Sequence, residues 1–367
     1  MKIAIFCDYF HSFGGTEYYN SMLATELKKH GVDVRVYICE KTKSPYWLDI
    51  LRKHGIEYRE PKRNRIDRND RAIDVEFIDE NIDNLNDWSP DIIHASPAGN
   101  LLQAYLNNNH KRKDIPIVAT EHTTPCANSE FWYPDGFQKC LQNIDAYITT
   151  CKASAKGVRK FHNFRKTIKV IPHLIRLQNI SMTERIPNSV GCIARMSPEK
   201  GIGILLPAWK EVVKKIPDAK LYLYGDGHGK NHFEELLLSL GLKGSVFFCG
   251  NFPPHLGISS VANKHDIFVQ PSLFESIPTT LIELSLLGRP MIATDVGGVK
   301  ELINKDTGIL IKSGSTDKLA KTIISLLQDK EKQKKLGENA KAFSMDKYSL
   351  DQNVSKIISF YQSVINK

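Results

Sequence analysis

Two glutamates in the segment QPSLFESIPTTLIELSLLGRP have the residue type and the spacing to hold a polar ligand. Glu275 stands just before an expected helix and Glu283 lies inside it. Pro278 suits the first helical position, where its missing N–H costs nothing, and Gly288 suits the left-handed position after the helix end. We therefore expect a helix from about Pro278 to Leu287, with one carboxylate before it and one within it.

The start of this helix predicts an anion site. Its first N–H groups, around Thr279 and Thr280, have no partner within the helix, and its dipole attracts a phosphate. At ~1.5 Å per residue, Glu275 and Glu283 stand about 10 Å apart. That separation suits one ligand with hydroxyls on both sides of a diphosphate, as a nucleotide-sugar has. The same residues are equally consistent with one glutamate that stabilises a helix start and another on a solvent-exposed face.

Two other turns contain residues suited to phosphate. In IARMSPEKG, Arg195 follows an expected strand and Lys200 lies about where the next helix begins, near Gly201. Together they offer two charges and a fork of donors for a diphosphate, although each alone could simply be solvated. In HSFGGTE, Gly14 and Gly15 let the backbone approach a ligand closely and start a helix.

A fourth turn, TEHTTP, places His122 after a strand. A lone histidine is more often a satisfied hydrogen-bonding residue than a catalytic one. The following SEFWYPDGF segment has Phe131, Trp132, Tyr133 and Phe137, which could stack on a sugar acceptor or pack as core or lid. The chain lacks complete G-x-G-x-x-G and G-x-x-x-x-G-K-[ST] patterns, so dinucleotide-binding and P-loop functions lose support.

These turns belong to a chain in which short β-branched runs alternate with helical patterns. Strands are expected at 2–7, 34–39, 91–95, 115–120 and 146–150, then at 189–194, 220–225, 245–250, 266–270 and 290–294. A helix is expected from Gly15 to His30, ended by Gly31, and another from about Lys200. This alternation predicts two parallel sheets covered by helices, joined by a linker at 172–188. Ligands bind such sheets beyond the carboxyl ends of the strands, where the four turns lie.

Bulk properties limit the class of protein. The 367 residues exceed what one hydrophobic core usually serves, so two domains are expected. The net charge of +9 is divided nearly evenly along the chain, with local basic segments at 59–71 and 152–169. No apolar stretch has the length of a membrane span or a secretion signal, so we expect a cytosolic protein.

Seven cysteines argue against a disulfide framework and a zinc site. They are odd in number, scattered, and never in a Cys-x-x-Cys pair. We expect them to be reduced and mostly in the core. They are Cys7, Cys39, Cys126, Cys140, Cys151, Cys192 and Cys249.

Taken in order, these segments resemble the family-4 retaining glycosyltransferases of the GT-B fold. The similarity covers nearly the whole chain and rests on GGTEYYNSMLATELKKHGVDVRVY, IARMSPEKGIGILL, LYGDGHGKNHFEELLLSLGLKGSVFFCG and VQPSLFESIPTTLIELSLLGRPMIATDVGG. The resemblance implies an α/β protein of two Rossmann-like βαβ domains that face each other across a cleft. Residues 1–178 would form the acceptor-binding domain and residues 188–349 the donor-binding domain, with a last helix at 350–367 packing back on the first.

The resemblance also implies a role for each site residue. Arg195 and Lys200 would hold the donor diphosphate. Glu275 would face the transferred sugar and Glu283 the ribose hydroxyls, while His122 would contact the donor sugar from the N-terminal side. The remaining donor-binding residues implied are Gly14, Gly15, Gly225, Gly227, Gly250, Asn251, Ser276, Ile277, Pro278, Thr279 and Thr280. In this chain EHTT replaces the more frequent His-Asp or His-Asn pairing, and ESIP lacks the glycine that many relatives have after the first glutamate.

The implied activity is transfer of a hexose or N-acetylhexosamine from a UDP- or GDP-linked sugar to a glycan, lipid-linked or small-molecule acceptor, as in polysaccharide biosynthesis. The resemblance implies retention of configuration by a front-face route, in which the leaving phosphate helps to deprotonate the acceptor. We expect no cofactor and no metal, because the chain has no Asp-x-Asp pair. A cytoplasmic location is expected, with peripheral docking at the inner membrane face through basic N-terminal segments as an option.

Two alternatives stay open. A nucleotide-sugar 2-epimerase of the same fold would convert its substrate without any acceptor. A non-catalytic nucleic-acid-binding protein would use the pI near 9.0, but the evenly divided charge and the lack of an RNA- or DNA-binding signature argue against nucleic acid as a partner.

Overall fold

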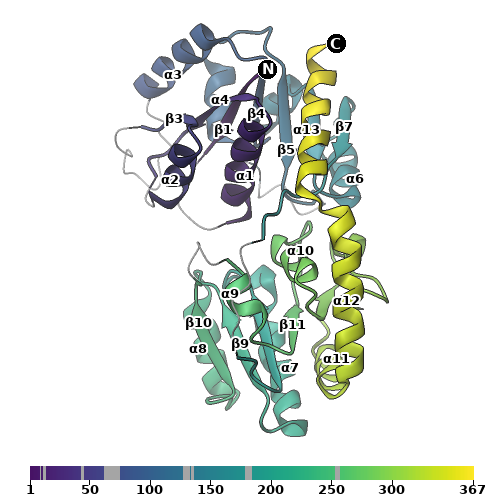
Figure 1. Cartoon of the computed structure of the whole chain (residues 1–367). Helices are drawn as coiled ribbons and strands as arrows, with labels where there is room; N and C mark the ends of the chain where they lie inside the picture. Colours follow the sequence, from purple (N-terminus) through teal and green to yellow (C-terminus); the bar gives the residue numbers. More distant parts are fainter. Residues whose placement is uncertain are drawn as a thin grey trace. The chain divides into compact units, whose positions relative to one another are not determined.

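The chain divides into two compact units in the computed structural model (Figure 1). The structure describes residues 1–8, 10, 14–42, 45–61, 75–126, 133, 136–177, 184–252 and 257–367. One unit comprises Met1–Leu174 with Leu350–Lys367, and the other Ile175–Ser349. Each is an open parallel sheet covered by helices, so the predicted α/β class with two βαβ domains is confirmed. The expected boundary at residue 178 and the aromatic residues 131 and 132 lie outside the described residues.

The first unit has a seven-stranded parallel sheet in the order β3-β2-β1-β4-β5-β6-β7. Its strands are β1 (Lys2–Cys7), β2 (Asp33–Ile38), β3 (Glu57–Arg59), β4 (Ile92–Ala95), β5 (Ile117–Glu121), β6 (Ala146–Thr149) and β7 (Thr167–Val170). Its helices are α1 (Gly15–Lys29), α2 (Pro45–Lys53), α3 (Val75–Trp88), α4 (Asn100–Asn107), α5 (Phe137–Asn143), α6 (Lys152–Phe161) and α13 (Leu350–Ile365). The two edge strands, β3 and β7, were not predicted, because they are short and partly exposed and so lack a buried apolar run.

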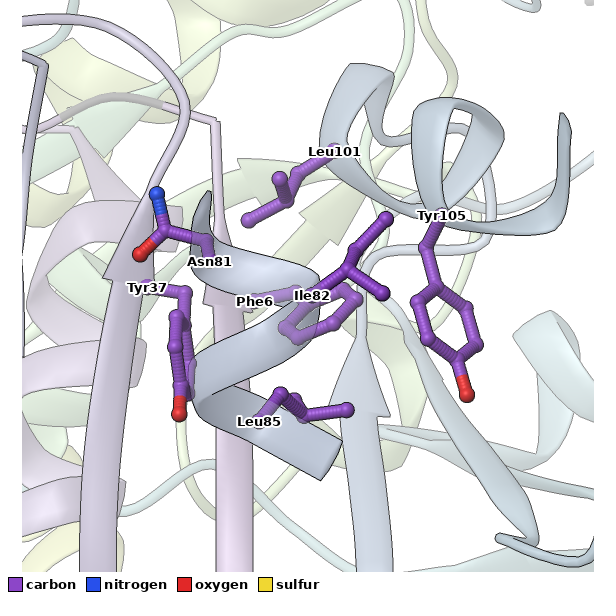
Figure 2. Close-up of a pocket in the computed structure, with 7 residues that line it drawn as sticks. All are labelled: Phe6, Tyr37, Asn81, Ile82, Leu85, Leu101 and Tyr105. Atoms are coloured by element: carbon purple, nitrogen blue, oxygen red, sulfur yellow. The ribbon is translucent and has the colours of Figure 1, made fainter. Parts of the chain in front are cut away.

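Apolar cores lie on both faces of this sheet. On one face, Ile357 and Phe360 of α13 pack in a cluster with Leu23 and Leu27 of α1. On the other face, α3 and α4 cover β1 and β2. Figure 2 shows a small cavity there, lined by Phe6, Tyr37, Asn81, Ile82, Leu85, Leu101 and Tyr105. The cavity has room for about one water molecule, so this face is closely packed.

The second unit has a six-stranded parallel sheet in the order β10-β9-β8-β11-β12-β13. Its strands are β8 (Ser189–Ile193), β9 (Lys220–Tyr224), β10 (Val246–Gly250), β11 (Ile267–Gln270), β12 (Met291–Thr294) and β13 (Ile309–Ile311). Its helices are α7 (Ile202–Lys215), α8 (Lys230–Ser239), α9 (Ser259–Ala262), α10 (Thr279–Leu286), α11 (Thr316–Gln328) and α12 (Lys330–Lys347). The strand order reverses between β8 and β11, which is where open α/β sheets bind ligands.

Helix starts in this unit follow from proline and glycine. The predicted helix at Lys200 begins instead at Ile202, because Pro198–Lys200 form a 3-10 turn and Gly201 adopts a left-handed φ of 73°. The predicted helix from Pro278 to Leu287 is α10, with these two residues as its caps, and Gly288 has the expected left-handed φ of 68°.

The sequence also predicts reduced cysteines and no membrane span. None of the seven cysteines, all of which lie in the described residues, forms a disulfide, and five of them are buried. None of the described helices is long and apolar enough to cross a membrane.

Gly191 in β8 offers a test of the packing of the second unit. A Cβ at this position would lie 2.4 Å from Cε1 of Phe268 and 2.9 Å from Cδ2 of His265. Gly191→Ala should therefore destabilise the protein by ~1–3 kcal/mol and lower its thermal unfolding midpoint. Gly203→Ala in α7 is the control, since its Cβ would meet Phe233 only at 3.8 Å. An unchanged midpoint in Gly191→Ala would contradict the described packing of β8 against β11.

Candidate active site

An ion pair joins the two loops at the reversal of strand order in the second unit. Lys200, after β8, donates from Nζ to Oε1 of Glu275, after β11, at 2.6 Å. The side chains are 19 % and 9 % exposed, so the pair is largely shielded from water. The sequence predicted that both residues face a donor, and the structure shows that they also contact each other.

A buried chain of polar groups fixes the Glu275 carboxylate. Ser272 Oγ donates to Oε1 of Glu275 at 2.9 Å, and Gln270 Nε2 donates to Ser272 Oγ at 3.0 Å. All three residues are buried. The second carboxylate oxygen, Oε2, has no hydrogen-bond partner in the described part of the chain, so it can accept a bond from a ligand. Sequence reasoning missed Gln270 and Ser272, because nothing in their types distinguishes them from ordinary strand-end residues.

Two glycines bring the backbone of neighbouring turns against this loop. A Cβ at Gly201 would lie 2.0 Å from the carbonyl oxygen of Pro271, and a Cβ at Gly297 would lie 1.8 Å from that of Glu275. The N–H of Gly298 donates to the carbonyl of Ser276 at 2.8 Å. Because any side chain at Gly201 or Gly297 would collide with backbone, glycine is required there to place the Lys200 and Glu275 loops together.

Arg195 is more loosely held than Lys200. Its side chain is 61 % exposed, and Nη2 pairs with Oε1 of Glu199 at 3.0 Å. Ser197 Oγ donates to the same oxygen at 2.5 Å. Burial acts to raise the pKa of Glu199, but the hydrogen bond from Ser197 and the charge of Arg195 leave it below the ordinary value. Glu199 was not predicted, although its position four residues after Arg195 is a sequence signal for a pair. An exposed pair of this kind is weak, so the guanidinium can reorient toward a ligand.

The start of α10 presents free donors beside Glu275. Pro278 is the N-cap, and its carbonyl accepts from the N–H groups of Leu281 and Ile282. The N–H groups of Thr279 and Thr280 have no partner among the described residues. They form the positive end of an eight-residue helix, where the sequence predicts an anion site, and anion binding there stays a prediction.

Glu283 lies half-buried further along α10. Burial raises its pKa to about 8. The side chain of Glu283 makes no hydrogen bond or ion pair within the described parts of the chain. A carboxyl group in this state gains from any ligand hydroxyl that donates to it.

The predicted glycines after β9 have a clear packing role. Gly225 and Gly227 have positive φ angles of 123° and 157°. A Cβ on them would lie 2.1 Å from the carbonyl oxygen of Ala194 and 2.7 Å from that of Met196. Gly250 accepts a bond from the N–H of Gly225 at 2.8 Å. These contacts align the ends of β8, β9 and β10, and the predicted contact of Gly225, Gly227, Gly250 and Asn251 with a nucleotide stays a prediction.

In the first unit, His122 is held by the turn that contains it. The buried carboxylate of Glu121 accepts from the N–H and Oγ1 of Thr123 at 3.0 and 2.6 Å, and from Tyr133 at 3.2 Å. The His122 ring lies edge-on to Tyr19, with centroids 4.8 Å apart. Burial lowers the pKa of His122 to about 3, so the ring is neutral at pH 7.

The two predicted glycines at the start of α1 differ in their surroundings. Gly14 is the N-cap, and a Cβ there would lie 2.5 Å from Oε2 of Glu17. A Cβ on Gly15 would meet nothing within 4 Å. Contacts with a ligand are untested for both. Across the described residues, no group of three or more His, Cys, Asp or Glu side chains could hold a metal ion.

Comparisons with known proteins agree with the fold of the two units. Residues 181–343 match the family described as Glycosyl transferases group 1, and residues 13–179 match Glycosyltransferase Family 4. Among solved structures, HepE from Anabaena, determined with UDP, is similar with a TM-score of 0.77 and 20% identity, covering 99% of this chain and 100% of that one. Sucrose-phosphate synthase from Thermosynechococcus elongatus has a TM-score of 0.78 and 18% identity, covering 100% and 99%.

Curated relatives match over shorter stretches. The alpha-D-kanosaminyltransferase of Streptomyces kanamyceticus is 30% identical over 173 residues, which is 47% of this chain and 45% of that protein. The GtfA subunit of a UDP-N-acetylglucosamine–peptide N-acetylglucosaminyltransferase from Streptococcus agalactiae is 26% identical over 276 residues, 70% of this chain and 54% of that one. The chain thus spans about half the length of these relatives. With two family matches that together cover most of its length, the chain belongs to the family-4, group 1 glycosyltransferases, and its two units have the GT-B fold.

Proposed function

We propose that this chain transfers a hexose or N-acetylhexosamine from a UDP- or GDP-linked sugar to a glycan, lipid-linked or small-molecule acceptor, with retention of anomeric configuration. The observation that carries the proposal is the shielded Lys200–Glu275 pair beside the free N–H groups of α10. The pair and the helix start lie at the reversal of strand order, where a nucleotide ligand is expected.

Different site residues bind different parts of the donor. Lys200, Arg195 and the N–H groups of Thr279 and Thr280 supply positive charge and donors to the diphosphate. The free Oε2 of Glu275 faces the transferred sugar. The Glu283 side chain, which has no partner among the described residues, accepts hydrogen bonds from the ribose hydroxyls. The resemblance assigns His122 to the donor sugar, and this remains a prediction.

The proposed reaction follows a front-face route. The bond between the anomeric carbon and the β-phosphate oxygen breaks, and the electron pair stays on that oxygen. The acceptor hydroxyl oxygen bonds to the same face of the anomeric carbon, and its proton passes to the leaving phosphate. Lys200, Arg195 and the start of α10 stabilise the negative charge that develops on the phosphate. The Glu275 carboxylate stabilises the positive character of the sugar ring in the transition state.

Relatives support a nucleotide-sugar donor. HepE from Anabaena has been determined with UDP-glucose and with UDP and glucose, and the GtfA subunit is named for UDP-N-acetylglucosamine. The experiment that tests the donor class is a thermal-shift panel of UDP- and GDP-linked sugars. A ligand present at ~100 times its dissociation constant adds about 2.7 kcal/mol of stability. A protein that responds to none of them would contradict the proposed donor.

Incubation with the nucleotide-sugar that binds, in the absence of any acceptor, separates transfer from epimerisation. Conversion of a nucleotide-sugar without an acceptor would indicate a 2-epimerase. A cytoplasmic protein that docks on the inner membrane face is proposed only as a route to a lipid-linked acceptor. Sedimentation with anionic liposomes at low salt tests that route, and absence of binding would favour an acceptor in solution.

Substitutions at the ion pair should separate binding from chemistry. Lys200→Ala or Arg195→Ala removes a charge-assisted contact worth ~1.5–3 kcal/mol, so kcat/KM should fall about 10- to 150-fold. Glu275→Gln should lower kcat more than donor affinity, because it removes charge where positive character develops. Steady-state kinetics with the donor found by the panel measures both.

Lys214→Ala is the matched control for these variants. Lys214 also pairs with a glutamate, Glu211 at 2.7 Å, but it lies exposed on α7. Its substitution should leave kinetics unchanged. Wild-type transfer rates in Glu275→Gln, Arg195→Ala and Lys200→Ala together would show that the active site is elsewhere.

The raised pKa of Glu283 predicts proton release on donor binding. Ribose hydroxyls that donate to the carboxyl favour its ionised form, so UDP binding near pH 7 should lower the pKa and release a proton. Calorimetry in two buffers of different ionisation enthalpy measures this release. Glu283→Gln should bind UDP more weakly and without the release. Equal proton release in wild type and Glu283→Gln would contradict the ribose role.

The unliganded protein supplies the corresponding stability test. Because the folded pKa of Glu283 lies above the unfolded value of 4.5, its contribution to stability is present below pH 4.5 and is lost as the pH rises toward 8. The midpoint of Glu283→Gln should therefore rise relative to wild type between pH 5 and pH 8. A pH-independent difference between the two proteins would show that Glu283 has an ordinary pKa.

Chelation tests the proposed charge compensation. Cations of the chain and a helix start are assigned here to the diphosphate, in place of a divalent ion. Transfer should therefore continue at an unchanged rate in excess EDTA. Complete loss of transfer, restored by magnesium or manganese, would contradict this assignment.

A further inference from the structure

A second imidazole stands next to His122 in the first unit. His173 follows β7 in the segment 171–174 and is 5 % exposed. Its ring is stacked on that of His122, with centroids 6.2 Å apart and an angle of 23° between the planes. Tyr19 of α1 lies edge-on to both rings, at 4.8 and 6.0 Å. The sequence predicted only that residue 173 lies in a linker. The structure places it just beyond the carboxyl end of β7.

The surroundings of the ring nitrogens indicate which nitrogen of each ring carries the hydrogen. The Nδ1 atoms of His122 and His173 are buried and have no hydrogen-bond partner among the described residues. The Nε2 atoms of the two rings are not among these buried, unpartnered atoms. His162 differs, because both of its nitrogens are buried and have no partner in the described ranges. Burial lowers the pKa of His122 to about 3 and that of His173 to about 4, so both rings are neutral at pH 7.

A neutral imidazole has one N–H group, and burying it unpaired is costly. The hydrogen is therefore favoured on Nε2, where water or a ligand can accept it. Both rings then offer an Nε2–H donor from the same cluster. Because the ring centroids are 6.2 Å apart, both donors lie within the span of one sugar ring.

A buried hydrogen-bonded chain holds the ring on which both imidazoles pack. Tyr361 of α13 bonds to His94 Nδ1 at 2.7 Å, His94 Nε2 lies 3.2 Å from Thr120 Oγ1, and Thr120 Oγ1 lies 3.4 Å from the Tyr19 hydroxyl. The chain connects α13, β4, β5 and α1. It fixes Tyr19, and with it the positions of the two neutral rings.

We propose that His173 is a further ligand-contacting residue, which together with His122 donates from Nε2–H to a hydroxyl of a sugar substrate. The inference rests on the proposed transfer function and names a contact within it. A sugar hydroxyl fits because the pair provides neutral donors. The hydroxyl belongs either to the donor sugar or to the acceptor, and kinetics distinguishes these two sources.

His173→Phe is the decisive variant. It keeps an aromatic ring in the stack and removes both nitrogens. The thermal midpoint should stay unchanged or rise, because an unpaired buried polar atom is lost. Transfer should fall about 2- to 12-fold in kcat/KM, as expected for one neutral hydrogen bond. A rise in KM for the nucleotide-sugar assigns the hydroxyl to the donor, and a rise in KM for the acceptor assigns it there.

Two further variants separate contact from packing. His173→Gln retains an N–H donor and should recover part of the lost kcat/KM. His162→Phe is the matched control, because His162 also packs against aromatic rings, Tyr133 and Phe137, at 4.6 and 4.8 Å. It should leave transfer unchanged.

The tautomer can be measured without turnover. In protein labelled with ¹⁵N-histidine at pH 7, the signals lost in His173→Phe should be those of a neutral ring protonated at Nε2. A charged ring or one protonated at Nδ1 would overturn the inference. Wild-type kinetics in His173→Phe would also overturn it. The same holds if His173→Phe lowers both the thermal midpoint and the activity and His173→Gln restores neither. A wild-type chain that is inactive with every nucleotide-sugar would instead overturn the proposed function, and this inference with it.

Discussion

The ion pair between Lys200 and Glu275 is the contact on which the architecture of the donor site depends. Two opposite charges with little exposure to water are stable together only when each is well compensated. Ser272 and Gln270 add hydrogen bonds on the carboxylate side. The 2.6 Å pair thus joins the loops after β8 and β11, and the other carboxylate oxygen of Glu275 has no partner within the described ranges.

Backbone geometry makes this pair possible. Gly201 and Gly297 each approach a carbonyl oxygen of the Glu275 loop so closely that no Cβ fits. The same loop runs into α10, whose first N–H groups have no partner in the part of the chain that the structure describes and whose Glu283 has a pKa raised by burial. The Glu275 carboxylate, the N–H donors of α10 and the Glu283 carboxyl group therefore follow one another along a short stretch of chain. This order matches the order of sugar, diphosphate and ribose in a nucleotide-sugar.

Much of this could be predicted from the sequence, because the signals are local. The β-branched runs predicted the buried strands, and Pro278 and Gly288 predicted the ends of α10. Ligands bind parallel sheets beyond the carboxyl ends of the strands, which indicated the turns that could bind one. The partners of the charges could not be predicted. Glu199, Ser272 and Gln270 contact the site only because separate strand ends meet at the reversal of strand order. His173 was missed for the same reason, since its stacking on His122 depends on the path of the chain after β7. The edge strands β3, β7 and β13 are too short to give a periodic signal.

The central claim is that the diphosphate of a nucleotide-sugar binds at the start of α10 against Lys200. The structure of the protein in complex with UDP tests it most directly. The account predicts that β-phosphate oxygens accept hydrogen bonds from the N–H groups of Thr279 and Thr280 and from the Lys200 ammonium, with the ribose hydroxyls on Glu283. A UDP molecule bound elsewhere, with these donors still facing solvent, would contradict it.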